Sequence, residues 1–76
     1  MPHVVIKLMA GRSEAQKQRL AELITQSVME GANCSEDAVS VTIEDIAAGT
    51  WTDAVYKPDI APHLDRLYKK PGYGAD

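Results

Sequence analysis

The residue with the clearest chemical potential is Pro2, which directly follows the initiator methionine. If Met1 is removed, Pro2 becomes a free secondary amine on a rigid ring, with no rotatable side chain to position. An α-amino group has an ordinary pKa of about 7.7–8.0, and desolvation or a nearby cation lowers this pKa by destabilising the charged form. Such an amine can act as a general base at neutral pH. Many proteins begin Met-Pro, so Pro2 gains significance from its position at the head of an apolar strand.

Two further residues have side chains suited to binding a substrate. Arg12 lies in a turn before a predicted helix, where its guanidinium and the amides of the helix N-terminus can receive an anion. Trp51 is the only tryptophan and follows the second predicted strand, where it can line an apolar pocket. Each residue also has a simpler interpretation, as a solvated turn arginine and as an aromatic cover over the core.

The remaining reactive side chains form no recognisable site. His3 and His63 are the only histidines, and they do not have metal-ligand spacing. We expect His3 to point to the strand face opposite the core and to be an interface residue. Cys34 is the only cysteine and has no activating histidine near it in the sequence, so we expect an incidental thiol. We therefore expect no metal and no organic cofactor.

Two short apolar segments predict the strands that must position these residues. Residues 2–9 are β-branched and apolar, and their alternation places Val4, Ile6 and Leu8 on one face, which should meet a helix. Residues 39–46 alternate between apolar and polar side chains, which predicts a second, half-buried strand. Together these segments frame one intervening helix.

The helix between the strands has clear signals at both ends. Ser13 and Gln16 have the spacing of a capping box, and an apolar stripe follows over residues 14 to about 29 or 30. Gly31 followed by Asn33 supplies a left-handed stop. Because the crossover is about 30 residues long, we predict a right-handed βαβ unit with parallel strands.

The last third of the sequence predicts a C-terminal helical extension. We expect a loop over residues 47–51 and a helix that starts near Asp59 and accommodates Pro62 in its first turn. The expected helix carries one apolar face, formed by Ile60, Leu64, Leu67 and Tyr68.

The length indicates one small domain over residues 1–76, and the order of strand, helix and strand makes it α/β (α+β). The eight Lys and Arg are scattered and the net charge is −3, which argues against nucleic acid as a partner. No apolar run approaches the roughly 18 residues of a membrane span, and no leader is recognisable, so we expect a cytoplasmic protein. Two parallel strands and one helix cannot form a stable sheet alone. We therefore expect another chain to complete the sheet.

Several of these segments together resemble the 4-oxalocrotonate tautomerase family of small βαβ proteins. The resemblance covers roughly residues 1–51 and is carried by Met1-Pro2, Gly11–Glu14, Gln16-Lys17, Val39–Ile46 and Ala48–Trp51. The last third, from Tyr56 to Lys69-Lys70-Pro71-Gly72-Tyr73, is similar to the PptA-type subgroup, whose members resemble phenylpyruvate tautomerases.

The resemblance implies a tautomerase that converts enols of aromatic 2-oxo acids to their keto forms. By this likeness Pro2 is the general base, Arg12 binds the carboxylate of the substrate, and Trp51 lines an apolar pocket. It also implies a homodimer rather than a hexamer, in which two strand pairs form one four-stranded sheet. Dicarboxylate-specific members carry a second arginine where this chain has Ser40, and its loss favours a monocarboxylate substrate.

Two other functions remain compatible with the sequence. A protonated Pro2 could support water addition to unsaturated acids or their dehalogenation, although these reactions generally need further groups to direct water, and none is obvious. A non-catalytic oligomeric binding module could retain the same scaffold, which the absence of an arginine at Ser40 would permit.

Overall fold

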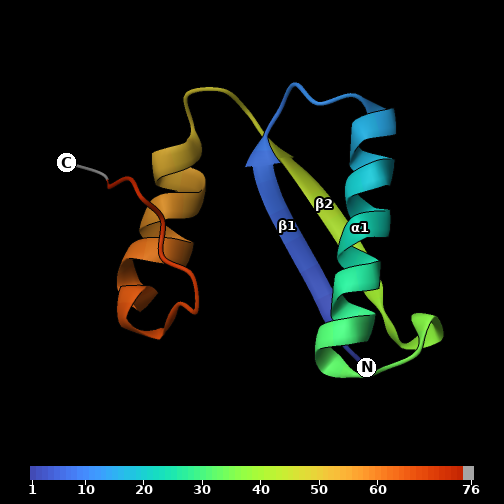
Figure 1. The fold of residues 1–76 in the computed structure, drawn as a ribbon. Coiled ribbons are helices and arrows are strands. Elements are labelled where there is room, and N and C mark those ends of the chain that lie inside the picture. Colours follow the sequence, from blue (N-terminus) through green and yellow to red (C-terminus); the bar gives the residue numbers. More distant parts are fainter. Residues whose placement is uncertain (75–76) are drawn as a thin grey trace.

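A two-stranded parallel sheet with one helix packed on it forms the first 46 residues (Figure 1). In this computed structural model, which describes residues 1–74, strand β1 spans His3–Met9 and strand β2 spans Ser40–Ile46. Helix α1 (Glu14–Ala32) crosses between them, and a single 3₁₀ turn, η1 (Glu36–Ala38), leads into β2. The predicted βαβ unit is confirmed.

The two faces of the sheet differ in polarity and exposure. β1 and β2 pair in continuous parallel register, from His3 opposite Ser40 to Met9 opposite Ile46. The face toward α1 carries half-buried apolar residues from both strands, namely Val4, Ile6, Leu8, Val41 and Ile43. On the opposite face Val5 is 50% exposed and Met9 is 44% exposed. The predicted alternation is therefore confirmed, and the open face of the sheet mixes these apolar side chains with polar and charged ones.

Local hydrogen bonds explain where α1 begins and ends. The Gln16 amide donates to the Ser13 hydroxyl at 3.1 Å, and the Ser13 amide donates to the Gln16 side-chain oxygen at 2.9 Å. These two bonds complete the predicted capping box. At the other end Asn33 adopts the left-handed conformation with φ of 54°, whereas Gly31 stays inside the helix. α1 therefore extends two residues beyond the later predicted end, Glu30.

The C-terminal helix begins earlier than the sequence predicted. It starts at Thr52 rather than near Asp59, as a π-helix, η2 (Thr52–Ile60), which continues into a 3₁₀ helix, η3 (Ala61–Arg66). Pro58 lies inside η2, where an α-helical proline would clash with the carbonyl four residues earlier. The wider π-helical turn relieves this clash, and the amide of Ala61 donates to the carbonyl of Tyr56, five residues back.

The predicted apolar face of this helix is also wrong in part. Leu67 and Tyr68 follow the end of η3, and Tyr68 is fully exposed. The buried residues of this region are Val55 and Tyr56, at 4% and 9% exposure, and the ring of Tyr56 lies 5.9 Å from the ring of Tyr73. The C-terminal segment therefore packs on itself, beside the βαβ unit.

The single chain is more open than a folded monomer of its size. Its accessible surface is 5712 Å², whereas surface scaling gives about 4,600 Å² for a compact protein of this mass. The radius of gyration is 14.0 Å, against about 11.4 Å expected for 76 residues. α1 contains no buried residue. These three observations support the expectation that further burial comes from association.

Candidate active site

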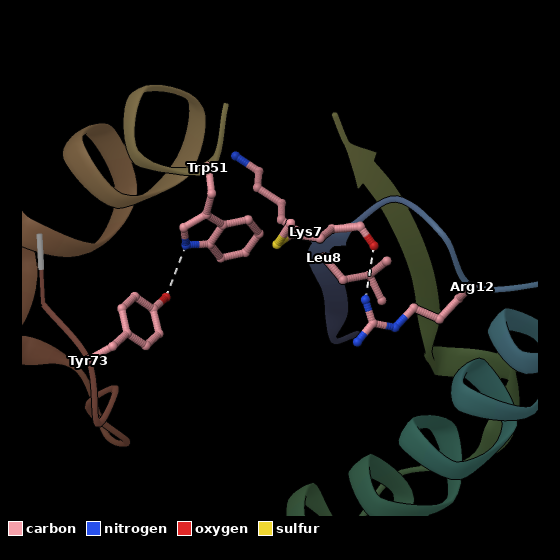
Figure 2. Close-up of a pocket in the computed structure, with 6 residues that line it drawn as sticks. Lys7, Leu8, Arg12, Trp51 and Tyr73 are labelled. Atoms are coloured by element: carbon pink, nitrogen blue, oxygen red, sulfur yellow. Dashed lines mark hydrogen bonds between the residues drawn. The ribbon is translucent and has the colours of Figure 1, made fainter. Parts of the chain in front are cut away.

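A cleft of about 380 Å³ lies between the C-terminal end of β1 and the start of η2 (Figure 2). Its volume falls in the range of small-molecule pockets. The lining combines two cationic side chains with aliphatic and aromatic ones: Lys7, Leu8, Met9, Arg12, Trp51 and Tyr73. Such a lining suits a small anion with an apolar tail.

Arg12 is positioned by the turn between β1 and α1. The Ala10 amide donates to the Ile46 carbonyl at 2.9 Å, and Gly11 then turns the chain with a φ of 132° that favours glycine. The guanidinium of Arg12 donates from Nη1 to the Met9 carbonyl at 3.0 Å (Figure 2). This bond uses one of its five N–H donors. Arg12 is thereby tethered at the exposed rim of the cleft while retaining donors for a carboxylate.

Trp51 forms the aromatic wall of the cleft. It lies at the start of η2, after a turn in which the Thr50 hydroxyl donates to the Ala47 carbonyl at 2.6 Å. The Trp51 indole Nε1 donates to the Tyr73 hydroxyl at 3.1 Å (Figure 2). The structure thus places Trp51 in the same cleft as Arg12, as a substrate-binding pair requires.

Two polar lining residues, Lys7 and Tyr73, are not among the sequence-predicted site residues. Lys7 Nζ donates to Asp59 at 2.5 Å, and this contact links β1 to η2. Lys7 Nζ also lies 4.0 Å from Glu44 of β2. The hydrogen bond that Lys7 donates to Asp59 is the main cause that raises the pKa of Lys7 above its ordinary value; desolvation opposes it, and the charges of Asp59 and Glu44 add to it. A lysine within an apolar strand indicates that an acidic partner is near, because charged side chains are seldom buried without an opposite charge. Tyr73 has no local sequence signal.

Pro2 lies outside this cleft. Its carbonyl accepts from the Ser40 amide at 3.2 Å, which places it at the start of both strands, whereas Arg12 follows the end of β1. At about 3.3 Å per strand residue, Pro2 and Met9 are roughly 23 Å apart. Within one chain the structure therefore brings together Arg12 and Trp51, but not Pro2.

A polar pair stands next to Pro2 on the open sheet face. The His3 ring Nδ1 and the Ser40 hydroxyl are 2.6 Å apart, a hydrogen bond between directly paired residues of β1 and β2. The prediction that His3 faces away from α1 is confirmed by this contact. Ser40 offers a hydroxyl, not a cation, at this position.

Residues 1–74 also bear on metal sites and membrane spans. In this part of the chain, no three His, Cys, Asp or Glu side chains are grouped in a way that could hold a metal ion. The helices of the same residues include none with the length and apolarity to cross a membrane.

Comparison with known proteins gives consistent matches. The family model described as "Tautomerase enzyme" matches residues 2–55. A probable tautomerase from Xylella fastidiosa is 42% identical over 74 residues, which cover 97% of this chain and 90% of that protein. Tautomerase PptA from Pectobacterium carotovorum is 40% identical over 74 residues, which cover 96% of this chain and 97% of that protein.

Solved structures show the same fold. A structure from work on the 4-oxalocrotonate tautomerase isozymes of Methylibium petroleiphilum matches with a TM-score of 0.64 and 36% identity, over 66% of this chain and 81% of that one. TomN, a 4-oxalocrotonate tautomerase homologue in the tomaymycin biosynthetic pathway, matches with a TM-score of 0.64 and 25% identity. That match covers 84% of this chain and 95% of TomN.

Proposed function

This chain belongs to the tautomerase family, and from that premise we propose that it converts enols of 2-oxo acids such as phenylenolpyruvate to their keto forms. Family membership supports isomerisation as the reaction class. The observation that carries the substrate class is the cleft that Arg12 and Trp51 share. A cation at its rim and an aromatic wall suit one carboxylate with an apolar, aromatic tail.

Pro2 is the proposed general base, acting after removal of Met1. The free amine takes the hydroxyl proton of the enol, and the electrons of the O–H bond form the carbonyl as the C=C bond opens. A proton then passes from the Pro2 ammonium to the neighbouring carbon, which regenerates the amine. One proton leaves oxygen and one reaches carbon, so the step is balanced without a cofactor.

Ser40 supports a preference for a single carboxylate. In this chain its hydroxyl is engaged with His3, at the position where the dicarboxylate-specific relatives described above have an arginine. A second substrate carboxylate near Pro2 would lose water without gaining a cationic partner. The same reasoning disfavours aliphatic dicarboxylates relative to aromatic monocarboxylates.

A second copy of the chain would bring Pro2 to the cleft. The outer edge of β1 has no strand beside it in the described chain. Antiparallel pairing of two β1 edges around a two-fold axis near Ile6 would set Pro2 of one copy opposite Ala10 of the other. The cleft residue Arg12 follows Ala10 by two positions. This homodimer would also join the two strand pairs into the four-stranded sheet expected from the sequence.

The proposed reaction is tested by the ultraviolet decay of phenylenolpyruvate, corrected for spontaneous ketonisation. The protein is first shown by mass spectrometry to lack Met1. We expect Pro2→Ala to lower kcat/KM by roughly 100-fold, because the rigid secondary amine is replaced by a mobile primary amine and positioning of a general base is worth about 10²–10⁴-fold.

Circular dichroism and sedimentation of Pro2→Ala should match those of the parent protein, since Pro2 precedes β1. Near-parental activity in Pro2→Ala would refute the role of Pro2. No catalysis by the processed parent protein would refute the proposed reaction.

A further inference from the structure

We infer that Tyr73 selects the tail of the substrate, by donating a hydrogen bond to a polar atom at the far end of an aromatic 2-oxo acid. The inference rests on the proposed function and extends it, because it assigns a specificity-determining role to a residue outside the reacting centre. A para-hydroxyphenyl tail has such an atom, whereas a phenyl tail does not.

In the hydrogen bond between Trp51 and Tyr73, Trp51 is the donor. An indole N–H can only donate, so the Tyr73 hydroxyl oxygen is the acceptor in this 3.1 Å contact. The hydroxyl hydrogen of Tyr73 is therefore not used by Trp51 and is available to another acceptor. Tyr73 is 51% exposed, so a ligand in the cleft can reach it.

The Tyr73 ring is held in place by its neighbours. Its centroid lies 5.9 Å from that of the buried Tyr56, with the planes tilted by 47°. This separation is typical of favourable aromatic pairs. With the ring packed on one side and its oxygen bonded to Trp51, the hydroxyl donor has a defined position.

The two polar walls of the cleft come from different parts of the chain. Arg12 precedes α1, while Tyr73 belongs to the C-terminal segment, and they lie on opposite sides of Trp51 and Leu8 (Figure 2). A substrate whose carboxylate binds Arg12 and whose ring packs on Trp51 would extend its far end toward Tyr73. The cleft is thus polar at both ends and apolar between them.

The expected discrimination is modest. Because Tyr73 is half exposed, water can satisfy its hydroxyl when a phenyl tail is bound, so the unsubstituted ligand is not penalised strongly. One neutral hydrogen bond then favours the hydroxylated ligand by about five-fold. Tyr73→Phe removes the donor and should leave the phenyl ligand unaffected.

Binding can be measured without turnover, because Trp51 is the only tryptophan and lines the cleft. We would titrate the full chain with 3-phenylpropionate and with 3-(4-hydroxyphenyl)propionate and follow tryptophan fluorescence. The parent protein should bind the hydroxylated acid about five-fold more tightly. In Tyr73→Phe this ratio should fall to about one, with the Kd for 3-phenylpropionate unchanged.

Tyr68→Phe is the matched control, because Tyr68 is fully exposed and does not line the cleft. It should retain the parental ratio. A parental ratio of one, or an equal ratio in the parent and Tyr73→Phe, would overturn the role of Tyr73. A ratio that responds to Tyr73 alone would support it.

The outcomes are independent of the Pro2 experiment. If Pro2→Ala stays active while the binding ratio responds to Tyr73, the proposed base is wrong and the tail contact stands. If Pro2→Ala is inactive while the ratio does not respond, the tautomerase mechanism stands and the role of Tyr73 is overturned.

Discussion

Arg12 shows how much of the proposed recognition depends on one planar group. A guanidinium can bind both oxygens of a carboxylate at once, which the single ammonium of a lysine cannot do. Its tether to the Met9 carbonyl at 3.0 Å limits its motion, so fewer conformations are lost when substrate binds.

Arg12→Lys should therefore lower kcat/KM for phenylenolpyruvate by roughly ten-fold, mainly through a higher KM, because charge is kept while paired hydrogen bonds are lost. Steady-state kinetics of the processed protein measures this. Arg19→Lys is the control, since Arg19 lies on the exposed part of α1, 3.5 Å from Glu22. Equal effects of the two substitutions would contradict a specific carboxylate contact at Arg12.

The candidate site was predictable only in part, because some of its contacts join residues that are far apart in the sequence. The roles proposed for Arg12 and Trp51 were suggested by their turns, which are local features, and both residues line the cleft. Tyr73 contacts Trp51 across 22 positions, and Lys7 contacts Asp59 across 52. Both contacts depend on the path of the C-terminal segment.

At the scale of elements, the first two thirds of the fold follow from local patterns. Alternation over β1 and β2 and the capping box at Ser13 are encoded within a few residues. The predicted start near Asp59 is wrong because the prediction used the 3.6-residue period of an α-helix, whereas the segment from Thr52 is a π-helix that includes Pro58. A π-helix has a different period and can contain this proline.

One ion pair joins α1 to the sheet and makes its packing dependent on pH. Lys17 Nζ lies 2.8 Å from Asp45, which shares the face of β2 that α1 covers, and 3.0 Å from Glu14. The hydrogen bonds that Lys17 donates to Asp45 and, second, to Glu14 raise the pKa of Lys17 above 10.5. A raised pKa means that the folded state favours the charged lysine, so its contribution is present below pH 10.5. The contribution is lost as pH rises through the folded-state pKa.

Lys17→Met should therefore lower the thermal unfolding midpoint at pH 7, and the difference from the parent should shrink above about pH 10.5. Differential scanning calorimetry from about pH 7 to about pH 12 measures this. Lys57→Met is the control, because the Lys57–Asp53 pair at 3.2 Å is exposed within η2 and should contribute little at any pH. A difference that persists unchanged at the highest pH would show that the side-chain stem, not the charge, matters.

At the scale of the whole molecule, the open features of the single chain point to one arrangement. The side chains of Val5 and Met9 are exposed, and the outer edge of β1 has no strand beside it in the described chain. The accessible surface is larger than expected for this mass, and α1 has no buried residue. The separation of Pro2 from the cleft adds a chemical reason for association. A site with Pro2 from one copy and Arg12 from another would work only in an oligomer.

Mixing two impaired variants tests this shared site directly. Pro2→Ala replaces the rigid secondary amine with a mobile primary amine, and Arg12→Gln removes the carboxylate contact, so the activity of each homodimer should be strongly reduced. In a mixed dimer, the intact Pro2 of the Arg12→Gln copy would meet the intact Arg12 of the Pro2→Ala copy. Random exchange makes about half of the dimers mixed, each with one intact site of two, so activity should recover to about a quarter of the parental value.

The mixture should be unfolded and refolded together, and native mass spectrometry should show that mixed dimers have formed. Activity equal to the mean of the two variants would mean that each site lies within one chain, and the antiparallel pairing of β1 edges would be wrong. A monomeric parent protein in sedimentation would contradict the assembly itself. Recovery above that mean requires residues of two chains in one site, which connects the free edge of β1 to catalysis.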